Sequence, residues 1–347
     1  MYKHFLKPIV MIQKSISITT LLLSFFLVFS SCIDKKKENE KEENSNIEQL
    51  NETSNLTQKD TIIRCQTMTV LEKHLVKTPD LRQKMERIEK QCQAFIQSRK
   101  ESKVTDFDTI VIPSIVHVIY SNSEQNISDA QIRSQIKVLN QDFSKSNTDI
   151  DQIPDEFLAL ASDVKIRFEL DSIIRISSTR TDWGTDDQMK FSSNGGSDVI
   201  DSDTHLNIWI CPIGGGILGY AQFPGDNPTT DGIVISPEYF GTEGFVQAPF
   251  NQGRTATHEI GHWLNLRHIW GDGNCSLDDF VDDTPVSDNP NFGCPLYPTT
   301  HCSSTDMTMN YMDYVDDACM HMFSTGQMER MRAVFAEDGG REGFAKL

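Results

Sequence analysis

Three histidines and a glutamate in one short segment have the types and the spacing of a catalytic zinc site. His258 and His262 are four residues apart, so on a helix they project from the same face, one turn above the other. Two imidazoles on one face supply two corners of a tetrahedral zinc site. His268 lies more than a turn further on, so we expect the helix to break near Asn265, a residue that tolerates the left-handed conformation of such a break. Glu259 is then placed to act as general base on a zinc-bound water.

Strands and helices at several places in the chain are expected to position this segment. Strands are predicted at 109–120, 164–170, 205–210 and 231–235, and helices at 132–143 and 326–336. Thr255 or Thr257 is expected to cap the helix that carries the histidines. The glycine-rich stretch 214–224 lacks the Gly-Lys-Ser/Thr of a phosphate loop. Because glycine lets another backbone approach closely, we expect an edge strand there that pairs with an extended peptide.

The charge of the chain excludes one class of partner. A net charge of −18 argues against nucleic acid, which needs concentrated Lys and Arg. Residues 251–320 contain 11 Asp and Glu against 2 Arg, half of the total net charge. Such a density could bind calcium, attract basic substrates or keep an exported protein soluble. Within it, a loop rich in oxygen ligands could hold calcium or simply be solvated: Asp278, Asp279, Asp282, Asp283 and Thr284.

Four of the eight cysteines are clustered near the C-terminal end: Cys275, Cys294, Cys302 and Cys319. An even, clustered set in an exported protein predicts two disulfides, and the sequence leaves three pairings open. The alternative, a second structural zinc site, lacks a Cys-x-x-Cys spacing. Cys211 ends a predicted strand and is expected to be a buried structural thiol.

The first sixty residues predict export. Residues 1–31 have the basic start and short apolar core of a secretory signal, which is too short for a membrane span. Small residues directly before Cys32 resemble a lipobox, so lipidation of Cys32 is predicted, with ordinary signal cleavage as the alternative. Residues 32–60 are almost without apolar side chains and predict a disordered tether. The expected location is the cell envelope or outer surface as a lipoprotein, or otherwise the secreted fraction.

Residues 61–103 are expected to form a helical pro-segment ahead of a catalytic domain at 104–347. Apolar residues recur there at helical spacing, and Pro79 divides two helices. Cys65 stands just before the first helix. A thiolate is an excellent zinc ligand, so an upstream cysteine can keep an exported zinc enzyme latent. The alternative is a thiol that pairs with Cys92 or remains free.

The motif His258-Glu259-x-x-His262-x-x-Asn265-x-x-His268, with Met312 further along, resembles that of the metzincin zinc endopeptidases. Within that clan the chain is similar to the pappalysins of the cytophagalysin branch over about residues 109–336. The stretches that carry this resemblance are the glycine-rich edge strand, 253–257, 283–285 and 310–314. Arg64-Cys65-Gln66-Thr67 resembles the family's cysteine switch. Two residues depart from the family pattern, because Asn265 and Gln66 both stand where glycine is usual.

The resemblance implies an α+β fold of the metzincin type. Its N-terminal subdomain has a twisted mixed sheet and the active-site helix, and its irregular C-terminal subdomain has the methionine turn and a C-terminal helix. The three histidines become the zinc ligands and Glu259 the base. Met312 becomes the turn beneath the metal, and Tyr314 is placed to hydrogen-bond the oxyanion.

The resemblance also implies features outside the zinc motif. It pairs Cys275 with Cys302 and Cys294 with Cys319. It suggests calcium at Asp279 and Thr284, Cys65 as the zymogen switch, and a preference for a basic residue just after the cleaved bond.

The expected function is therefore that of an exported zinc endopeptidase acting on protein or peptide substrates. One alternative is a catalytically inert, protease-like surface lipoprotein used for binding or adhesion, against which the intact Glu259 argues. Another is a zinc hydrolase acting on a non-peptide bond, which the peptide-pairing edge strand makes less expected. The sequence predicts no oligomeric state and no membrane contact beyond the lipid anchor.

Overall fold

The computed structural model describes residues 62–102 and 107–346. The predicted signal segment, the tether and Cys32 lie outside the described residues. Within those two ranges, no helix combines the length and the apolar character needed to cross a membrane.

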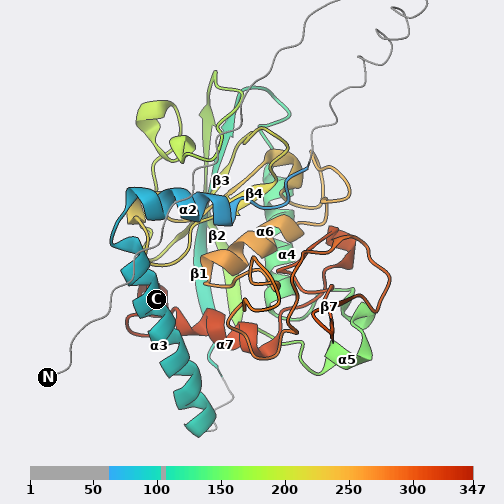
Figure 1. The fold of residues 1–347 in the computed structure, drawn as a ribbon. Coiled ribbons are helices and arrows are strands. Elements are labelled where there is room, and N and C mark those ends of the chain that lie inside the picture. The colour runs from blue at the N-terminus through green and yellow to red at the C-terminus, as the bar shows by residue number, and fades with distance from the viewer. Residues whose placement is uncertain (1–61, 103–106, 347) are drawn as a thin grey trace, which may run out of the picture. The chain divides into compact units, whose positions relative to one another are not determined.

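A five-stranded mixed sheet lies at the centre of the fold (Figure 1). In spatial order its strands are β2 (Ile166–Ser177), β1 (Ile110–Tyr120), β3 (Leu206–Ile210), β5 (Ile233–Ile235) and β4 (Gly219–Ala221). Neighbouring strands are parallel except that β4 runs antiparallel to β5. The glycine-rich stretch therefore supplies an edge strand, as predicted, and the mixed sheet agrees with the predicted fold class.

Apolar side chains cover both faces of the sheet, as expected for strands that are largely parallel. On one face, α4 (Asp129–Phe143) and α6 (Arg254–Trp263) bury Leu139 and Trp263 in the main core. On the other face, Trp183 and Trp209 form the centre of a second cluster. α4 begins three residues before the predicted range, where the Ser128 side chain caps it by accepting a hydrogen bond from the Gln131 amide at 3.1 Å.

The start of α6 differs from the prediction that Thr255 or Thr257 caps it. Its N-cap is Gly253, at φ 79°, which has no side chain to accept a hydrogen bond from the helix. The cap is instead a carboxylate from far along the chain. Asp317 accepts hydrogen bonds from the amides of Gln252 (2.9 Å) and Arg254 (3.1 Å). A negative charge at a helix N-terminus also interacts favourably with the helix dipole.

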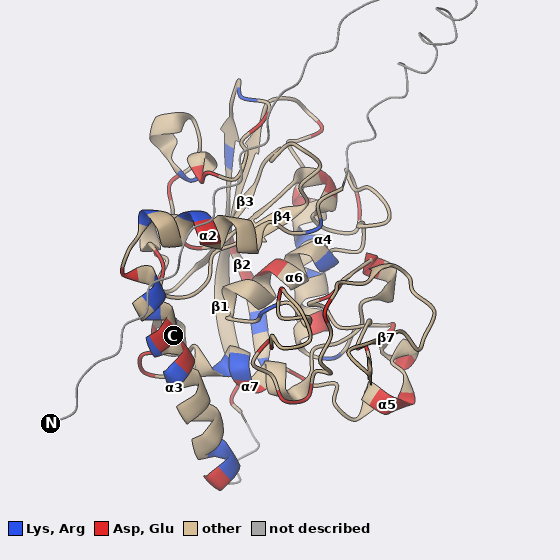
Figure 2. Ribbon diagram, in the orientation of Figure 1, with Lys and Arg blue, Asp and Glu red and all other residues tan. Residues whose placement is uncertain are grey.

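The segments after α6 are largely irregular. Short pieces of regular structure occur in order as β6 (Phe292–Gly293), β7 (Thr300–His301), β8 (Ser304–Thr305), β9 (Tyr314–Val315) and α7 (Thr325–Ala333), and α5 (Asp155–Leu158) lies near them (Figure 1). Disulfides join Cys275 to Cys302 and Cys294 to Cys319, which is the pairing that the resemblance implies. Acidic residues recur along these loops (Figure 2).

Two helices from the N-terminal side pack onto this domain. α2 (Thr67–Lys77) lies beside β4, and α3 (Leu81–Ser102) lies against α7. The break between them falls at the predicted Pro79. A partly buried ion pair joins α3 to α7, because the Glu89 carboxylate accepts two hydrogen bonds from Arg330 of α7, at 3.0 and 2.6 Å.

Candidate metal centre and active site

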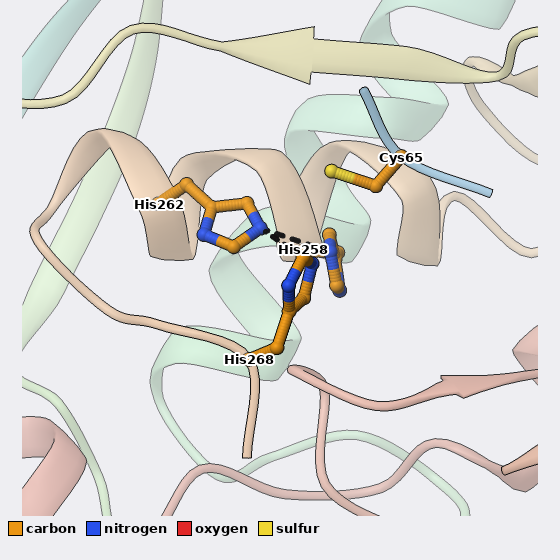
Figure 3. Close-up of side chains that lie close together, drawn as sticks. All are labelled: Cys65, His258, His262 and His268. Carbon is orange, nitrogen blue, oxygen red and sulfur yellow. Dashed lines mark hydrogen bonds between the residues drawn. The ribbon is translucent and has the colours of Figure 1, made fainter. Parts of the chain in front are cut away.

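The Nε2 atoms of the three motif histidines converge on one point (Figure 3). His258 and His262 project from α6, and His268 comes from the segment after it. The Nε2 atom of His262 lies 3.1 Å from that of His258 and 3.1 Å from that of His268. Nitrogen ligands about 2.0–2.1 Å from a tetrahedral zinc ion are about 3.4 Å apart. The spacing therefore fits three ligands of one ion.

The opposite nitrogen of each ring fixes its orientation. The acceptors of the three Nδ1–H groups are the Tyr311 carbonyl for His258 (2.7 Å), the Leu266 carbonyl for His262 (2.8 Å) and the Asp272 carboxylate for His268 (2.5 Å). Rings that donate from Nδ1 carry lone pairs on Nε2, and three converging lone pairs cannot hydrogen-bond one another. Such a donor set fits a cation and is typical of zinc ligation. Burial lowers the pKa of His258 and His262 well below the usual value, which favours the neutral form that binds metal.

A sharp turn after α6 brings His268 to the other two rings. Asn265 has φ 73°, the left-handed conformation predicted for it. Its amide donates to the His262 carbonyl at 2.9 Å, and the Leu266 amide donates to the Gly261 carbonyl at 2.9 Å. These two bonds form a Schellman motif with Asn265 in the position usually taken by glycine. The predicted break in the helix is thus confirmed.

Met312 lies beneath α6, fully buried, at the point where the helix carries Gly261. A Cβ built at Gly261 would lie only 2.4 Å from the Met312 sulfur, so a side chain does not fit there without displacing the methionine. The Met312 amide donates to the Asn310 side chain at 2.9 Å, which fixes the turn. The predicted methionine turn therefore lies below the helix of the metal centre.

The Tyr314 ring packs beside the histidines. Its centroid lies 4.8 Å from that of His268 and 5.7 Å from that of His258. Burial raises the pKa of Tyr314 well above the usual value, and the nearby Cys65 and Glu259 add to the shift. The phenol therefore keeps its proton and can donate a hydrogen bond.

Glu259 is fully buried beside the ligand His258. Its Oε2 atom accepts hydrogen bonds from the Thr67 hydroxyl (2.7 Å) and the Cys65 thiol (3.5 Å). Its Oε1 atom has no hydrogen-bond partner among the described residues. Burial raises the pKa of Glu259 to about 7, although the bonds from Thr67 and Cys65 act in the opposite direction. A carboxylate with a pKa near neutrality can both take and return a proton.

Cys65 completes the cluster. One ligand atom from Cys65 and one from each of His258, His262 and His268 all lie within 4.8 Å of one another (Figure 3). A tetrahedral zinc site takes four ligands, and the Cys65 sulfur is close enough to the three ring nitrogens to be a candidate for the fourth. Burial raises the pKa of this thiol well above the usual value, and the negative charge of Glu259 adds to the shift.

The chain on either side of Cys65 runs along the edge strand. The Ile63 amide donates to the Gly216 carbonyl at 2.9 Å, and the Gln66 amide donates to the Gly219 carbonyl at 3.0 Å. The Ile63 carbonyl accepts from the Leu218 amide at 3.0 Å. Residues 63–66 thus already occupy the backbone-pairing position that we predicted for an extended peptide.

Arg64 extends a basic side chain into a buried site next to the metal centre. Its guanidinium donates to the Thr255 hydroxyl at 2.6 Å and to the Asp317 carboxylate at 3.4 Å. It also lies over the Phe250 ring, 4.8 Å from the centroid. The residues that cap α6 therefore also bind a basic side chain of the N-terminal segment.

The predicted calcium residues lie together and are already hydrogen-bonded to each other. The Thr284 hydroxyl donates to both carboxylate oxygens of Asp279, at 2.9 and 2.8 Å. Burial raises the pKa of Asp279 well above the usual value. Cys211, the predicted structural thiol, is fully buried, and the Cys92 thiol lies 3.9 Å from the Arg330 carbonyl oxygen rather than near Cys65.

Four residues of the site were not predicted from sequence: Arg64, Thr67, Asp272 and Asp317. Asp272 follows His268 by four residues, a spacing that could have suggested a partner for its ring. Arg64 lies one residue before the predicted switch cysteine, Cys65, and Thr67 lies two residues after it. Asp317 carried no local signal, because its contacts reach back 63 residues to Arg254 and 253 to Arg64.

Known proteins of similar sequence are metalloproteases, which agrees with a metal centre at the three histidines. The family model described as pregnancy-associated plasma protein-A matches residues 197–336. An extracellular metalloprotease of Verticillium alfalfae is 33% identical over 244 residues, covering 66% of this chain and 78% of that protein. An extracellular metalloprotease of Arthroderma benhamiae is 33% identical over 240 residues, covering 66% and 73%.

Two solved structures from Tannerella forsythia are also similar. Mature mirolysin in complex with a cleaved peptide is 46% identical and has a TM-score of 0.67, covering 69% of this chain and 96% of that one. A promirolysin mutant is 42% identical, with a TM-score of 0.73, covering 81% and 96%. The family match, the extracellular relatives and the geometry of the histidines agree, and the chain belongs to the pappalysin, or pregnancy-associated plasma protein-A, family of metzincin zinc metalloendopeptidases.

Proposed function

We propose that the matured chain hydrolyses peptide bonds with Glu259 as general base. The position of that carboxylate carries the proposal. It follows the ligand His258 directly, and Thr67 and Cys65 occupy one of its oxygens while the other has no partner among the described residues. Departure of the segment that carries Thr67 and Cys65 would free both oxygens for a water molecule and its proton.

Each residue of the site has a distinct part in this reaction. When bound, zinc supplies Lewis-acid chemistry, because it lowers the pKa of a water to about 7 and polarises a carbonyl. Glu259 takes a proton from the attacking water and passes it to the leaving amine. Tyr314 donates a hydrogen bond to the oxyanion of the tetrahedral intermediate. β4 pairs with the substrate backbone along the same edge that residues 63–66 occupy here in parallel. The substrate runs in the opposite direction, so that its downstream residue reaches the site that Arg64 occupies.

We also propose that residues 61–103 are an inhibitory pro-segment and residues 104–347 the catalytic domain. Two observations support this division. The Cys65 thiol lies at the fourth ligand position, and the backbone on either side of it occupies the pairing edge of β4. In addition, the promirolysin structure covers more of this chain than the mature form does, 81% against 69%.

Replacing Cys65 by alanine is expected to shorten the latency of the precursor. The variant loses a metal ligand and the thiol hydrogen bond to Glu259, so the pro-segment should leave about tenfold faster or more, the effect of one charge-assisted contact. The time before peptide cleavage begins, followed by fluorescence after purification of the full chain, measures this. Cys92→Ala is the matched control, since it removes a buried thiol of the same segment outside the metal centre. An activation time equal to that of the unmodified precursor would refute the switch.

We propose further that the enzyme prefers a basic residue just after the cleaved bond. Arg64 supports this, because its guanidinium is bound by Asp317 and Thr255 beside the metal centre. Burial raises the pKa of Asp317, while the charge of Arg64 acts in the opposite direction. Loss of Arg64 would leave a buried carboxylate without that cation, and a basic substrate side chain would restore the pair.

A casein digest analysed by mass spectrometry tests the function and this preference together. The matured protein is expected to cleave casein chiefly before Arg and Lys, about tenfold or more faster than before neutral residues. A hydrogen bond to a charged group contributes more binding free energy than one between neutral groups. The precursor is expected to cleave little. Absence of cleavage by the matured protein would support the inert surface protein instead. Cleavage without regard to the following residue would contradict only the preference.

Export agrees with the extracellular relatives. The signal segment, the tether and lipidation of Cys32 remain predictions. Metabolic labelling with palmitate tests the last of these, and an unlabelled protein would contradict it. Calcium at Asp279 and Thr284 is likewise a proposal, supported by the paired oxygens of these two side chains. An unfolding temperature that does not change with added calcium would exclude it.

A further inference from the structure

Two carboxylates of the catalytic domain form hydrogen bonds with one histidine of the pro-segment. His74 of α2 places its Nε2 atom 2.9 Å from Asp187 and its Nδ1 atom 2.5 Å from Asp226. The side chains of Asp187 and Asp226 are only 8% and 4% exposed, so this is a desolvated site and not a surface contact. The hydrogen bonds to Asp187 and then Asp226 raise the pKa of His74 to about 9. A cation is therefore bound between these two acids at neutral pH.

Rigid groups of the catalytic domain hold the acid pair in place. The Tyr220 hydroxyl, from the edge strand β4, donates to Asp187 at 3.0 Å, and the buried Lys190 ammonium lies 2.9 Å from the same carboxylate. Asp226 lies five residues beyond β4, where one of its oxygens accepts the Asn227 amide at 2.7 Å and the other faces His74. Departure of α2 would leave both carboxylates in place. Asp187 would keep Lys190 as its cation, and Asp226 would lose His74.

The acid pair lies along the path of an extended substrate. Residues 63–66 run along β4 with Arg64 at Asp317 and Cys65 at the metal centre, and α2 continues beside β4 to His74 (Figure 1). Seven residues of helix from Thr67 to His74 span about 10 Å. An extended peptide covers that distance in about three residues. Asp317 and the acid pair thus lie on opposite sides of the metal centre along this path.

We propose that Asp187 and Asp226 form a substrate subsite for a basic side chain on the upstream side of the cleaved bond, about three to five residues before it. This inference depends on the proposed peptidase function and on the proposed placement of the downstream residue at Asp317. Departure of α2 exposes the Asp226 and Asp187 oxygens that face His74, and an Arg or Lys of the substrate can form charge-assisted hydrogen bonds with them in its place. The pro-segment fills both sites with its chain direction reversed relative to such a substrate, because Arg64 precedes Cys65 and lies at the downstream site while His74 follows it and lies at the upstream site.

Peptide series with the matured enzyme test the subsite. The full chain is produced and allowed to mature, and it then receives peptides with one fixed cleavage site in an alanine background. Arg is moved through the second to sixth positions before that site. One position is expected to raise kcat/KM by about tenfold or more, mainly through KM, as a charge-assisted hydrogen bond would. In Asp226→Asn, the ratio of kcat/KM between the Arg and alanine peptides should fall toward one.

The matched control is Asp186→Asn, which neutralises the neighbouring, exposed carboxylate that binds Lys73 and should keep the full ratio. No preference at any position, or a preference that survives Asp226→Asn, would overturn the subsite. Failure to cleave any peptide, including those without Arg, would instead overturn the peptidase function.

A second measurement varies the peptide and begins with the unmodified matured enzyme. A synthetic peptide of residues 62–78 is expected to inhibit the matured enzyme, and His74→Ala in that peptide should weaken inhibition by about tenfold. Against Asp226→Asn enzyme the two peptides should differ much less, as in a double-mutant cycle. Equal inhibition of the unmodified enzyme by both peptides would also overturn the proposal.

Discussion

Replacing Glu259 by alanine is expected to lower kcat for peptide cleavage by about 10²–10⁴-fold, the usual contribution of a general base. The variant should still bind zinc, because the convergent ligand atoms come from His258, His262, His268 and Cys65, and Glu259 is not among them. Zinc content by mass spectrometry and cleavage rates of the matured protein measure the two effects separately. A protein that holds metal and has lost cleavage is the specific signature of the missing base.

The control for this change is Glu243→Ala, which removes an exposed glutamate from a loop. It should retain both zinc and activity. If Glu259→Ala cleaves as fast as the unmodified enzyme, the proton must pass through another group and the mechanism is wrong. If instead the variant loses zinc, the Glu259 side chain supports the metal centre. Glu259→Gln then separates this role from proton transfer, because glutamine keeps the shape of glutamate but cannot act as a base.

Replacing Asn265 by valine is expected to cost zinc affinity and activity together. A β-branched residue is a strong outlier at φ 73°, and holding a residue in such a conformation costs about 1–3 kcal/mol. The protein can relieve that strain by opening the turn. Opening would break the Leu266 amide bond to Gly261 and move the Leu266 carbonyl that holds the His262 ring. His268, which reaches the centre only through this turn, would move as well.

The matched variant is Asn265→Gly, which accepts a positive φ without strain and is expected to retain zinc. Zinc affinity by competition with a chelator, and the unfolding temperature of each precursor, separate loss of metal from general loss of stability. A valine variant with the zinc affinity of the unmodified protein would mean that the turn is not what brings His268 to the metal.

The convergence of the three histidines could be predicted from the sequence because its determinants are local. The four-residue spacing of His258 and His262 fixes their common face, and Asn265 marks the break that lets His268 return. The edge strand was also predictable, because glycines in a strand let another backbone approach closely and these glycines are visible in the sequence. The strands of the sheet were predictable because their residues either alternate between apolar and polar or form short continuous apolar runs.

The contacts on which the proposed latency and recognition depend could not be predicted in the same way. The cap of α6 was assigned to the nearest threonines, because nothing in the sequence shows that a carboxylate some sixty residues later reaches those amides. The pairs Arg64–Asp317 and His74–Asp226 join residues 253 and 152 positions apart. Such pairs depend on the packing of α2 against β4, which only the assembled fold defines.

Asp317 has a consequence for any attempt to redesign this enzyme. One of its oxygens binds the basic side chain of Arg64, while the other accepts the amides of Gln252 and Arg254 at the start of α6, the helix that carries His258 and His262. The proposed selectivity and the anchoring of the α6 N-terminus therefore depend on the same carboxylate. An engineer who exchanged Asp317 to accept a different side chain would have to supply a new anchor for the helix, and variation at this position among natural descendants should be constrained for the same reason.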